Sequence, residues 1–331
     1  MAEFYTIKVP EYSGSQHVST LVTATEYLPP RYEYKGNFYT VIMESRQSIV
    51  DGEAQSSHDL DIAFRGEVSW GGVHVGQDMF SKTLTFALPA KSRQNAYLNA
   101  IAKKVGAANY RSLAVYDRTS YKQISKPGLY IVKPELGARA IGQIVFEYPE
   151  VTPSAIEQLI LGNHTLDGFL DQLKKRNLKA QYHSPRDHSK DEGYAILREA
   201  RLYSEYLTNV SNEYRLTTGA DSSAMYCTPR YIKTVSDSDQ AITVKQATVI
   251  GDGSLGPTYR FQSISIDQPT RDEINSVLNE AQLPLHSIDL FFTSDGKWGI
   301  FEYSTSFCCI KIPSDYVAGE IKELIHRTLN D

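Results

Sequence analysis

The fold is decided near the C-terminus by the stretch Ser287-Ile-Asp-Leu-Phe-Phe-Thr-Ser-Asp-Gly-Lys-Trp-Gly-Ile-Phe-Glu-Tyr-Ser304. Two runs of aromatic and aliphatic residues flank the strong turn signal of residues 294–297, and this pattern predicts a β-hairpin. Asp289 on the first run and Glu302 on the second each lie between two apolar neighbours. Because side chains alternate along a strand, we expect both carboxylates to face the same side of the hairpin.

Two like charges held side by side in a sheet are unfavourable unless a cation neutralises them. Carboxylate oxygens suit Mg²⁺, which usually takes one or two carboxylates together with substrate phosphates. The alternative is a half-exposed hairpin whose two acids are simply solvated. The hairpin by itself leaves both interpretations open.

A second informative segment is Val132-Lys133-Pro134, which ends an apolar strand and precedes a loop bracketed by Gly137 and Gly142. A lysine in this position can reach a phosphate that the backbone N–H groups of the loop approach. No Walker A pattern is present, because the glycine loop lacks the following Lys-Ser/Thr pair. The alternative is a β-hairpin with an exposed lysine.

Composition limits the classes of function. The 331 residues carry 34 basic and 39 acidic side chains, a net charge of −5, and 41% of them are hydrophobic. This composition excludes global disorder, and it provides no basic excess for a nucleic-acid partner. No apolar run reaches membrane-spanning length, the first residues do not resemble a signal peptide, and three cysteines make no disulfide framework. We therefore expect a cytoplasmic protein with no membrane or nucleic-acid partner.

The pattern of the chain predicts mixed helices and strands. Short strands are expected within residues 1–88, and apolar spacing predicts a helix over 91–106. Thr270 and Glu273 form a capping-box pattern that predicts a helix starting there, and His183 falls in a polar, mobile loop over 182–193. Further helices are predicted in two pieces over 152–181 and from Ser314, and strands over 112–115, 129–132, 143–146, 213–218, 226–232, 241–250 and 259–266.

Taken in order, these features resemble the ATP-grasp superfamily of carboxylate–amine or carboxylate–thiol ligases, over about residues 88 to 312. The ordered set is a lysine before a helix, a Val-Lys-Pro strand, a glycine-rich loop, an acidic hinge, an acid-x-Arg strand and the Asp…Glu hairpin. The resemblance implies an α+β fold in which two α/β lobes clamp a nucleotide behind a small N-terminal α/β lobe. The implied divisions are 1–88, 89–206 and 207–331.

The resemblance also implies roles for individual residues. Those implied to bind ATP are Lys91, Lys133, Gly137, Gly142, Glu205, Leu207 and Glu213. The arginines implied to act on the transferring phosphoryl or acyl phosphate are Arg139, Arg215 and Arg230. Simpler interpretations exist: Lys82 rivals Lys91, and Glu213 with Arg215 could be an ordinary salt bridge.

For the metal, the resemblance implies that Asp289 and Glu302 hold Mg²⁺. The family usually has an asparagine as the third ligand, and Ser304 stands in that place. A serine hydroxyl is a weaker ligand, so this departure bears on catalysis more than on nucleotide binding.

The resemblance implies an ATP-dependent, Mg²⁺-dependent ligase. Such an enzyme joins a carboxylate to an amine through an acyl phosphate, and its substrates would be small molecules or peptides. Two alternatives stay open: a kinase on the same scaffold that phosphorylates a hydroxyl, and a catalytically weakened nucleotide-binding or scaffold protein.

Overall fold

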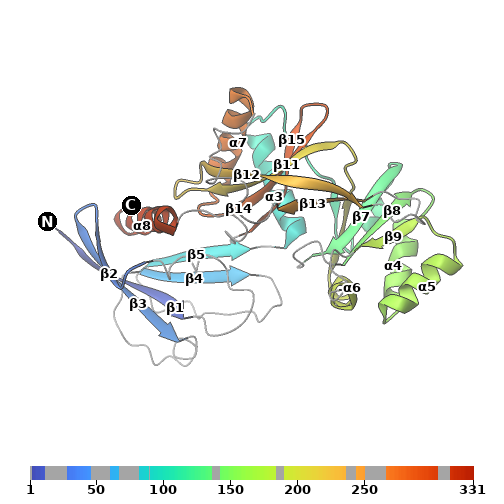
Figure 1. The fold of residues 1–331 in the computed structure, drawn as a ribbon, viewed down its shortest axis with the longest axis horizontal. Helices are drawn as coiled ribbons and strands as arrows, with labels where there is room; N and C mark the ends of the chain where they lie inside the picture. The colour runs from blue at the N-terminus through green and yellow to red at the C-terminus, as the bar shows by residue number, and fades with distance from the viewer. Residues whose placement is uncertain are drawn as a thin grey trace.

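The computed structural model describes residues 2–11, 28–45, 60–66, 82–88, 90–135, 142–183, 190–235, 244–249, 266–304 and 314–331. Within these ranges the chain forms three five-stranded sheets with helices between and around them. The third sheet in sequence order lies between the other two along the long axis of the molecule (Figure 1). The predicted α+β class is confirmed. The predicted 259–266 strand lies outside the described residues apart from its last residue.

The first sheet has the strand order β2-β3-β1-β4-β5 and is mostly parallel. The strands are β1 (Phe4–Glu11), β2 (Arg31–Tyr34), β3 (Asn37–Ser45), β4 (Leu60–Gly66) and β5 (Lys82–Leu88). The C-terminal helix α8 (Ser314–Asn330) packs on this sheet although it is remote in sequence. Its buried side chains Ile321 and Ile325 share one apolar cluster with Ile7 and Tyr39.

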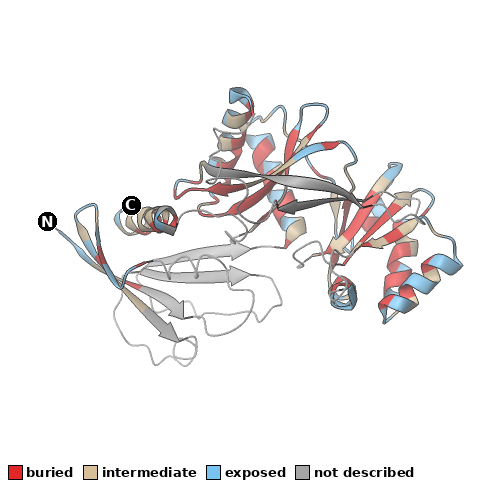
Figure 2. Cartoon of the chain, in the orientation of Figure 1, coloured by how far each residue is buried: buried red, intermediate tan, exposed pale blue. Residues whose placement is uncertain are grey.

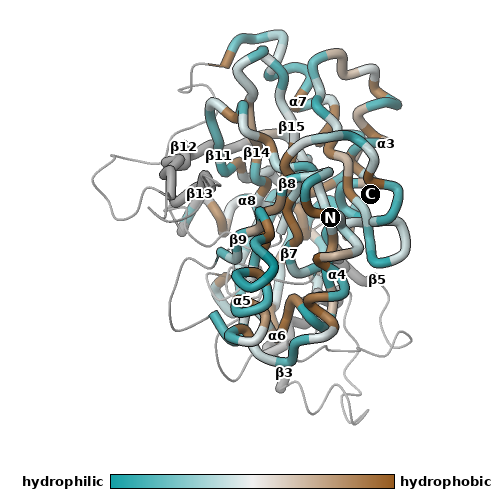
Figure 3. Tube along the Cα trace, turned by 90° about the vertical axis from the view of Figure 1, so that its right-hand side faces the viewer, coloured by the Kyte–Doolittle hydropathy of each residue, from teal (hydrophilic) through white to brown (hydrophobic). Residues whose placement is uncertain are grey.

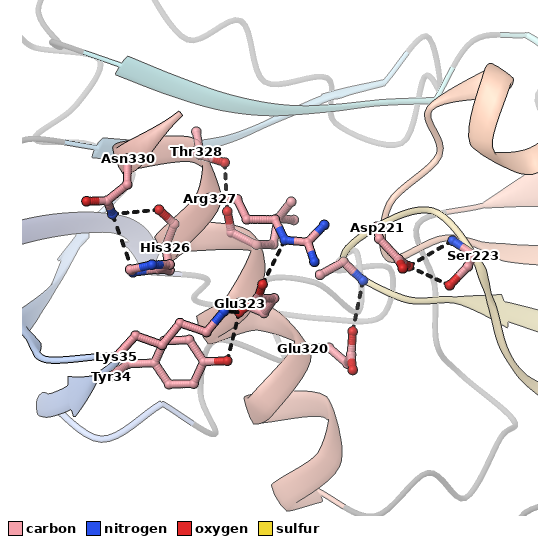
Figure 4. A network of polar contacts seen from close by, with 12 residues as sticks. Tyr34, Lys35, Asp221, Ser223, Glu320, Glu323, His326, Arg327, Thr328 and Asn330 are labelled. Atoms are coloured by element: carbon pink, nitrogen blue, oxygen red, sulfur yellow. Dashed lines mark hydrogen bonds and ion pairs between the residues drawn. The ribbon is translucent and has the colours of Figure 1, made fainter.

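Polar contacts reinforce this packing of α8 (Figure 4). The Tyr34 hydroxyl donates to Glu323 Oε2 at 2.9 Å, and Lys35 Nζ lies 2.7 Å from the same carboxylate. About one turn earlier in the same helix, Glu320 accepts a hydrogen bond from the backbone N–H of Ala220 at 2.9 Å. Helix α8 therefore ties the first sheet to the start of the third.

The second sheet is antiparallel, in the order β6-β10-β7-β8-β9. Its strands are β6 (Val115–Tyr116), β7 (Gly128–Pro134), β8 (Gln143–Tyr148), β9 (Ala180–His183) and β10 (Arg201–Glu205), and the short 3₁₀ helix η1 spans Tyr121–Gln123. Helices α4 (Pro153–Gly162), α5 (Leu166–Lys175) and α6 (Lys190–Glu199) pack their apolar sides on one face of it. In Figure 2 the red, buried segments of this region lie where the helices meet the strands.

The third sheet is also antiparallel, in the order β13-β12-β11-β14-β15. Its strands are β11 (Val210–Thr218), β12 (Ala224–Val235), β13 (Val244–Val249), β14 (Ser287–Thr293) and β15 (Trp298–Ser304). Helices α3 (Lys91–Lys104) and α7 (Gln268–Ala281) cover one face, and Leu98 and Ile274 share an apolar cluster there with Ile288 and Leu290. Hydrophobic segments lie towards the middle of the molecule, and the outer helix α5 is largely hydrophilic (Figure 3).

Two local predictions are wrong. Helix α7 begins before the predicted capping box, because the Asp267 carboxylate accepts the hydrogen bond of Thr270 N at 2.8 Å and Pro269 suits the first turn. This leaves Glu273 to bind elsewhere: it accepts the indole N–H of Trp298 at 2.9 Å. His183 is the buried last residue of β9, since its register with Gln143 continues the sheet.

The predicted division into 1–88, 89–206 and 207–331 stays a prediction. Two helices pack away from the sheet of their own range, α3 on the third sheet and α8 on the first. None of the described helices is both long and apolar enough to cross a membrane.

The second sheet contains a buried ion pair that predicts a stability effect. The fully buried Arg201 guanidinium binds both carboxylate oxygens of Glu157, which also accepts the Tyr203 hydroxyl. We expect Glu157→Gln to lower the free energy of unfolding by about 3–5 kcal/mol, because the buried positive charge of Arg201 then has no negative charge beside it. Urea denaturation measures this change.

The matched control uses an exposed pair on α5, in which Lys175 Nζ lies 2.6 Å from Asp171. Asp171→Asn should change the free energy of unfolding by less than about 1 kcal/mol. An effect of Glu157→Gln as small as that of the control would contradict the role given to the buried pair.

Candidate functional site

A row of charged side chains crosses three strands of the third sheet. Arg215 on β11 is the register partner of Asp289 on β14, and Asp289 is the register partner of Glu302 on β15. The neighbours Leu216, Ile288 and Tyr303 point to the opposite face, where they join the cluster beneath α3 and α7. The prediction that Asp289 and Glu302 face the same side is confirmed.

The guanidinium of Arg215 binds Asp289 through two hydrogen bonds. Nε donates to Oδ1 at 2.7 Å and Nη2 donates to Oδ2 at 2.8 Å, with both side chains mostly buried. This fork geometry is the strong form of a charge-assisted pair. Arg215 therefore neutralises one of the two adjacent carboxylates.

Lys91 neutralises the other carboxylate from the first turn of α3. Its Nζ lies 3.0 Å from Glu302 Oε2. The next turn ties the helix to β15: Gln94 accepts a hydrogen bond from Tyr303 N at 3.0 Å, and Asn95 donates to Phe301 O at 3.3 Å. Because these contacts flank Glu302 in the sequence, they fix Lys91 opposite that carboxylate.

Lys133, near the end of β7, brings a third cation from the second sheet. Burial lowers the pKa of its ammonium to about 8, and the charge of Lys91 adds to this effect against the opposing attraction of Glu302. Burial by itself would raise the pKa of Glu302, but Lys91 and Lys133 outweigh burial and hold it well below its usual range. The structure thus brings together five predicted residues: Lys91, Lys133, Arg215, Asp289 and Glu302.

Glu135 also belongs to this cluster, and sequence reasoning missed it. One carboxylate oxygen accepts the backbone N–H of Ser92 at 2.9 Å and also binds the Ser92 hydroxyl, so Glu135 caps the start of α3. Its position directly after Lys133-Pro134 links β7 to the helix that carries Lys91. The signal was an acid two residues after the lysine, but only the contact with α3 gives it meaning.

Glu205 begins the acidic hinge that the resemblance implies, the segment from Glu205 to Leu207, and it lies at the end of β10, where the chain passes to the third sheet. Its carboxylate accepts a hydrogen bond from Arg111 Nη2 at 2.7 Å. Arg111 follows α3, and its backbone N–H binds Trp298 O at the edge of the third sheet. This ion pair therefore links the two segments of chain that run between the second and third sheets, one after α3 and one after β10. Leu207, two residues after Glu205, packs in an apolar cluster with Phe291.

The remaining predicted residues are placed only partly. Gly142 has a positive φ of 71°, and a Cβ there would lie 2.2 Å from the backbone oxygen of Gly193 in α6, so this position requires glycine. Glu213 is the register partner of Arg230 on β12, and Ser304 ends β15 next to Ser287. Gly137 and Arg139 lie outside the described residues.

The second sheet faces this region with a mixed surface that sequence reasoning also missed. Ile131 and Val145 are register partners on the face opposite the helices, in a small apolar cluster with Tyr206. Gln181 pairs with Val145 in the same row, and its buried Oε1 has no hydrogen-bond partner among the described residues. An apolar strip with one amide is a surface that suits a planar base.

Asp289 and Glu302 offer oxygen ligands of the kind that Mg²⁺ takes. Two carboxylates stand on neighbouring strands, and the described residues contain no cluster of three or more acids, histidines or cysteines that could hold a metal. Two carboxylates plus phosphate oxygens is the usual set for Mg²⁺, so the residues fit that ion in the presence of a nucleotide. Asp289 and Glu302 would hold it once Arg215 and Lys91 turn to phosphate oxygens.

Several solved structures match most of the length of this chain at low sequence identity. The chain is similar to a D-alanine–D-alanine ligase from Bacillus anthracis complexed with ATP, at 11% identity and a TM-score of 0.43, over 99% of this chain and 97% of that one. It is similar to the macrocyclase MdnC from Microcystis aeruginosa, bound with the precursor peptide MdnA, at 10% identity and a TM-score of 0.46, over 97% and 99%.

The chain is also similar to a structure of the ATP-grasp ligase PsnB complexed with a minimal precursor. The ATP-grasp ligase PsnB matches at 12% identity and a TM-score of 0.35, over 72% of this chain, which spans 62% of the PsnB chain. No protein-family model and no curated protein matches the sequence.

The lowered pKa of Lys133 predicts a pH dependence. Its ammonium loses charge as the pH rises through about 8, so an anionic ligand at this cluster, tested with MgATP, should bind more weakly between pH 8 and 10. The unfolded chain keeps that proton up to about pH 10.5, so over the same interval this lysine contributes a stability that rises with pH. Calorimetric titration and urea denaturation measure the two trends.

Lys133→Arg is the matched control, because a guanidinium stays charged throughout this interval. We expect it to flatten both pH trends relative to the unchanged chain. Equal pH profiles for the two proteins would contradict the assignment of the titration to Lys133.

Proposed function

We propose that this protein is an ATP-dependent ligase that joins a carboxylate to an amine through an acyl phosphate. The observation that carries the proposal is the cross-strand row of Arg215, Asp289 and Glu302 with Lys91 and Lys133 converging on it. Three cations and two adjacent carboxylates in one half-buried cluster match the needs of a metal-bound polyphosphate.

The ion pairs Arg215–Asp289 and Lys91–Glu302 support a role of this cluster in binding phosphate. Arg215 and Lys91 each satisfy a carboxylate that would otherwise repel its neighbour. A triphosphate with Mg²⁺ offers both sets of groups new partners, because phosphate oxygens attract the cations and the metal attracts the freed carboxylates. The exchange keeps every charge paired, so the cluster can admit its ligand without exposing an isolated charge.

In the proposed reaction, Lys91, Lys133 and Arg215 spread the charge of the transferring γ-phosphoryl group. Mg²⁺ supplies additional neutralisation of the phosphate oxygens when it is bound. The substrate carboxylate attacks the γ-phosphorus and ADP leaves. The amine then attacks the acyl carbon and displaces phosphate. The chain positions the reactants and excludes water from the acyl phosphate, which water would otherwise hydrolyse.

We propose that the adenine binds at the hinge. It would lie against the strip of Ile131 and Val145 and the backbone after Glu205, with Leu207 beside it. We further propose that Glu213 binds the ribose, that Gly137 and Gly142 bracket the loop over the phosphates, and that Arg139 and Arg230 face the transferred group. Ser304 is proposed as a weak third ligand of Mg²⁺. We propose small molecules or peptides as the carboxylate and amine substrates.

Glu302→Gln tests the proposed function. The substitution keeps the shape of the side chain but removes a charged metal ligand, so Mg²⁺-dependent ADP formation should fall by at least about 100-fold. The assay supplies ATP, Mg²⁺, a panel of carboxylic acids and peptides, and hydroxylamine, which converts an acyl phosphate into a hydroxamate. ADP and hydroxamate are measured together.

Glu280→Gln is the control, because Glu280 is a carboxylate at the surface, paired with Lys104 and remote from the row. It should leave turnover unchanged. Undiminished ADP formation by Glu302→Gln would refute the metal assignment, and ADP with a phosphorylated alcohol instead of a hydroxamate would identify a kinase.

A second candidate is a nucleotide-binding protein with weakened catalysis. It is favoured by the two ion pairs that already neutralise Asp289 and Glu302, and by the serine at position 304. Such a protein would bind ATP equally well with EDTA and with Mg²⁺, and it would form no ADP with any member of the panel.

A further inference from the structure

A second row, of hydroxyl groups, runs beside the charged row of the third sheet. Thr217 is the register partner of Ser287, and Ser287 is the register partner of Ser304. Each hydroxyl lies two residues along its strand from Arg215, Asp289 or Glu302 respectively. Because side chains alternate, both rows lie on the same face, about 7 Å apart along the strands.

Two of these hydroxyls, those of Thr217 and Ser287, are almost completely buried. Thr217 is 0% exposed and Ser287 is 2% exposed. Neither Thr217 Oγ1 nor Ser287 Oγ has a hydrogen-bond partner among the residues that the structure describes. Buried hydroxyls are almost always satisfied, since an unmade hydrogen bond is costly. Two orphaned hydroxyls side by side therefore indicate a ligand that the row is built to receive.

The adjacent Thr218 shows the ordinary state of such a group. It is equally buried, but it faces the other side of the strand, where its Oγ1 donates to the backbone oxygen of Leu283 and lies 3.3 Å from that of His286. Burial in this part of the sheet thus does not by itself leave a threonine hydroxyl unsatisfied.

The order of side chains along β14 and the segment before it tells which ligand fits. Phe291 belongs to the apolar cluster at the hinge with Leu207, and Asp289 marks the charged row. Ser287 follows, and Leu285 then joins the cluster between α8 and the first sheet. From the hinge outward the side chains on this face of the sheet are apolar, then charged, then hydroxylated, which is the order of base, phosphates and terminal phosphate oxygens in a nucleotide.

We propose that Thr217 and Ser287 bind the γ-phosphoryl group of ATP. Their hydroxyls can rotate to donate to its oxygens, while the cations of the neighbouring charged row neutralise its charge and that of the inner phosphates. This inference rests on the proposed function and adds to it a pair of neutral donors that distinguish ATP from ADP. A metal ion fits these two hydroxyls poorly, because divalent metals that take oxygen ligands require carboxylates or several carbonyls.

The test compares binding of Mg-AMP-PNP and MgADP by titration calorimetry in Thr217→Val, Ser287→Ala and the double variant. Each lost hydroxyl should weaken Mg-AMP-PNP about tenfold, the effect expected for a hydrogen bond to a charged group. MgADP should bind within about twofold of its original affinity, because it has no γ-phosphoryl group. Thr217→Ser keeps the hydroxyl and should bind both ligands normally.

Thermal unfolding gives an independent readout. Removing an unsatisfied hydroxyl should leave the melting temperature of Thr217→Val and Ser287→Ala unchanged or raised. Thr218→Val removes a satisfied hydroxyl, so it should lower the melting temperature without changing the ratio of the two affinities.

The outcomes separate the two levels of the proposal. Equal weakening of both ligands, or no weakening of either, would overturn the γ-phosphoryl site while leaving ATP binding established. Failure of the unchanged protein to bind either nucleotide would overturn the proposed function itself, and this inference with it.

Discussion

The structure depends on one electrostatic constraint, the direct pairing of Asp289 and Glu302 across neighbouring strands. Two carboxylates in this position repel each other unless cations reach both. Arg215 supplies one cation from within the sheet, and Lys91 supplies the other from a helix that precedes the sheet by more than a hundred residues in the sequence. The apolar packing of α3 on the third sheet, and the cap that Glu135 gives its first turn, place Lys91 opposite Glu302.

The same constraint explains why the second and third sheets are joined as they are. Lys133 can contribute to the cluster only if β7 ends close to the third sheet. The Arg111–Glu205 pair links the two segments of chain that run between these sheets. The surface between them changes from apolar at the hinge to charged and then to hydroxylated. This gradient matches a nucleotide from its base to its terminal phosphate, and it gives the proposed function its direction along the sheet.

Much of the fold could be predicted from local patterns. The turn at residues 294–297 and the alternation around Asp289 and Glu302 predicted both the hairpin and its polar face, because strand geometry alone fixes these features. The start of α7 was predicted wrongly, since Asp267 and Thr270 are both competent caps and Asp267, followed by Pro269 in the first turn, is the one that caps the helix. Glu135 and Arg111 were missed, because their partners are distant in the sequence.

The sequence by itself therefore determined the α+β class and which residue types carry the charge. Periodicity and turn chemistry act over a few residues and need no tertiary context. Tertiary structure alone decided that Arg215 binds Asp289 and that Lys91 binds Glu302. It also decided that the hydroxyls of Thr217 and Ser287 find no hydrogen-bond partner within the part of the chain that the structure describes. The physical reason is that charge pairing and hydrogen-bond satisfaction depend on distances between segments, which only the register of the sheet and the packing of its helices establish.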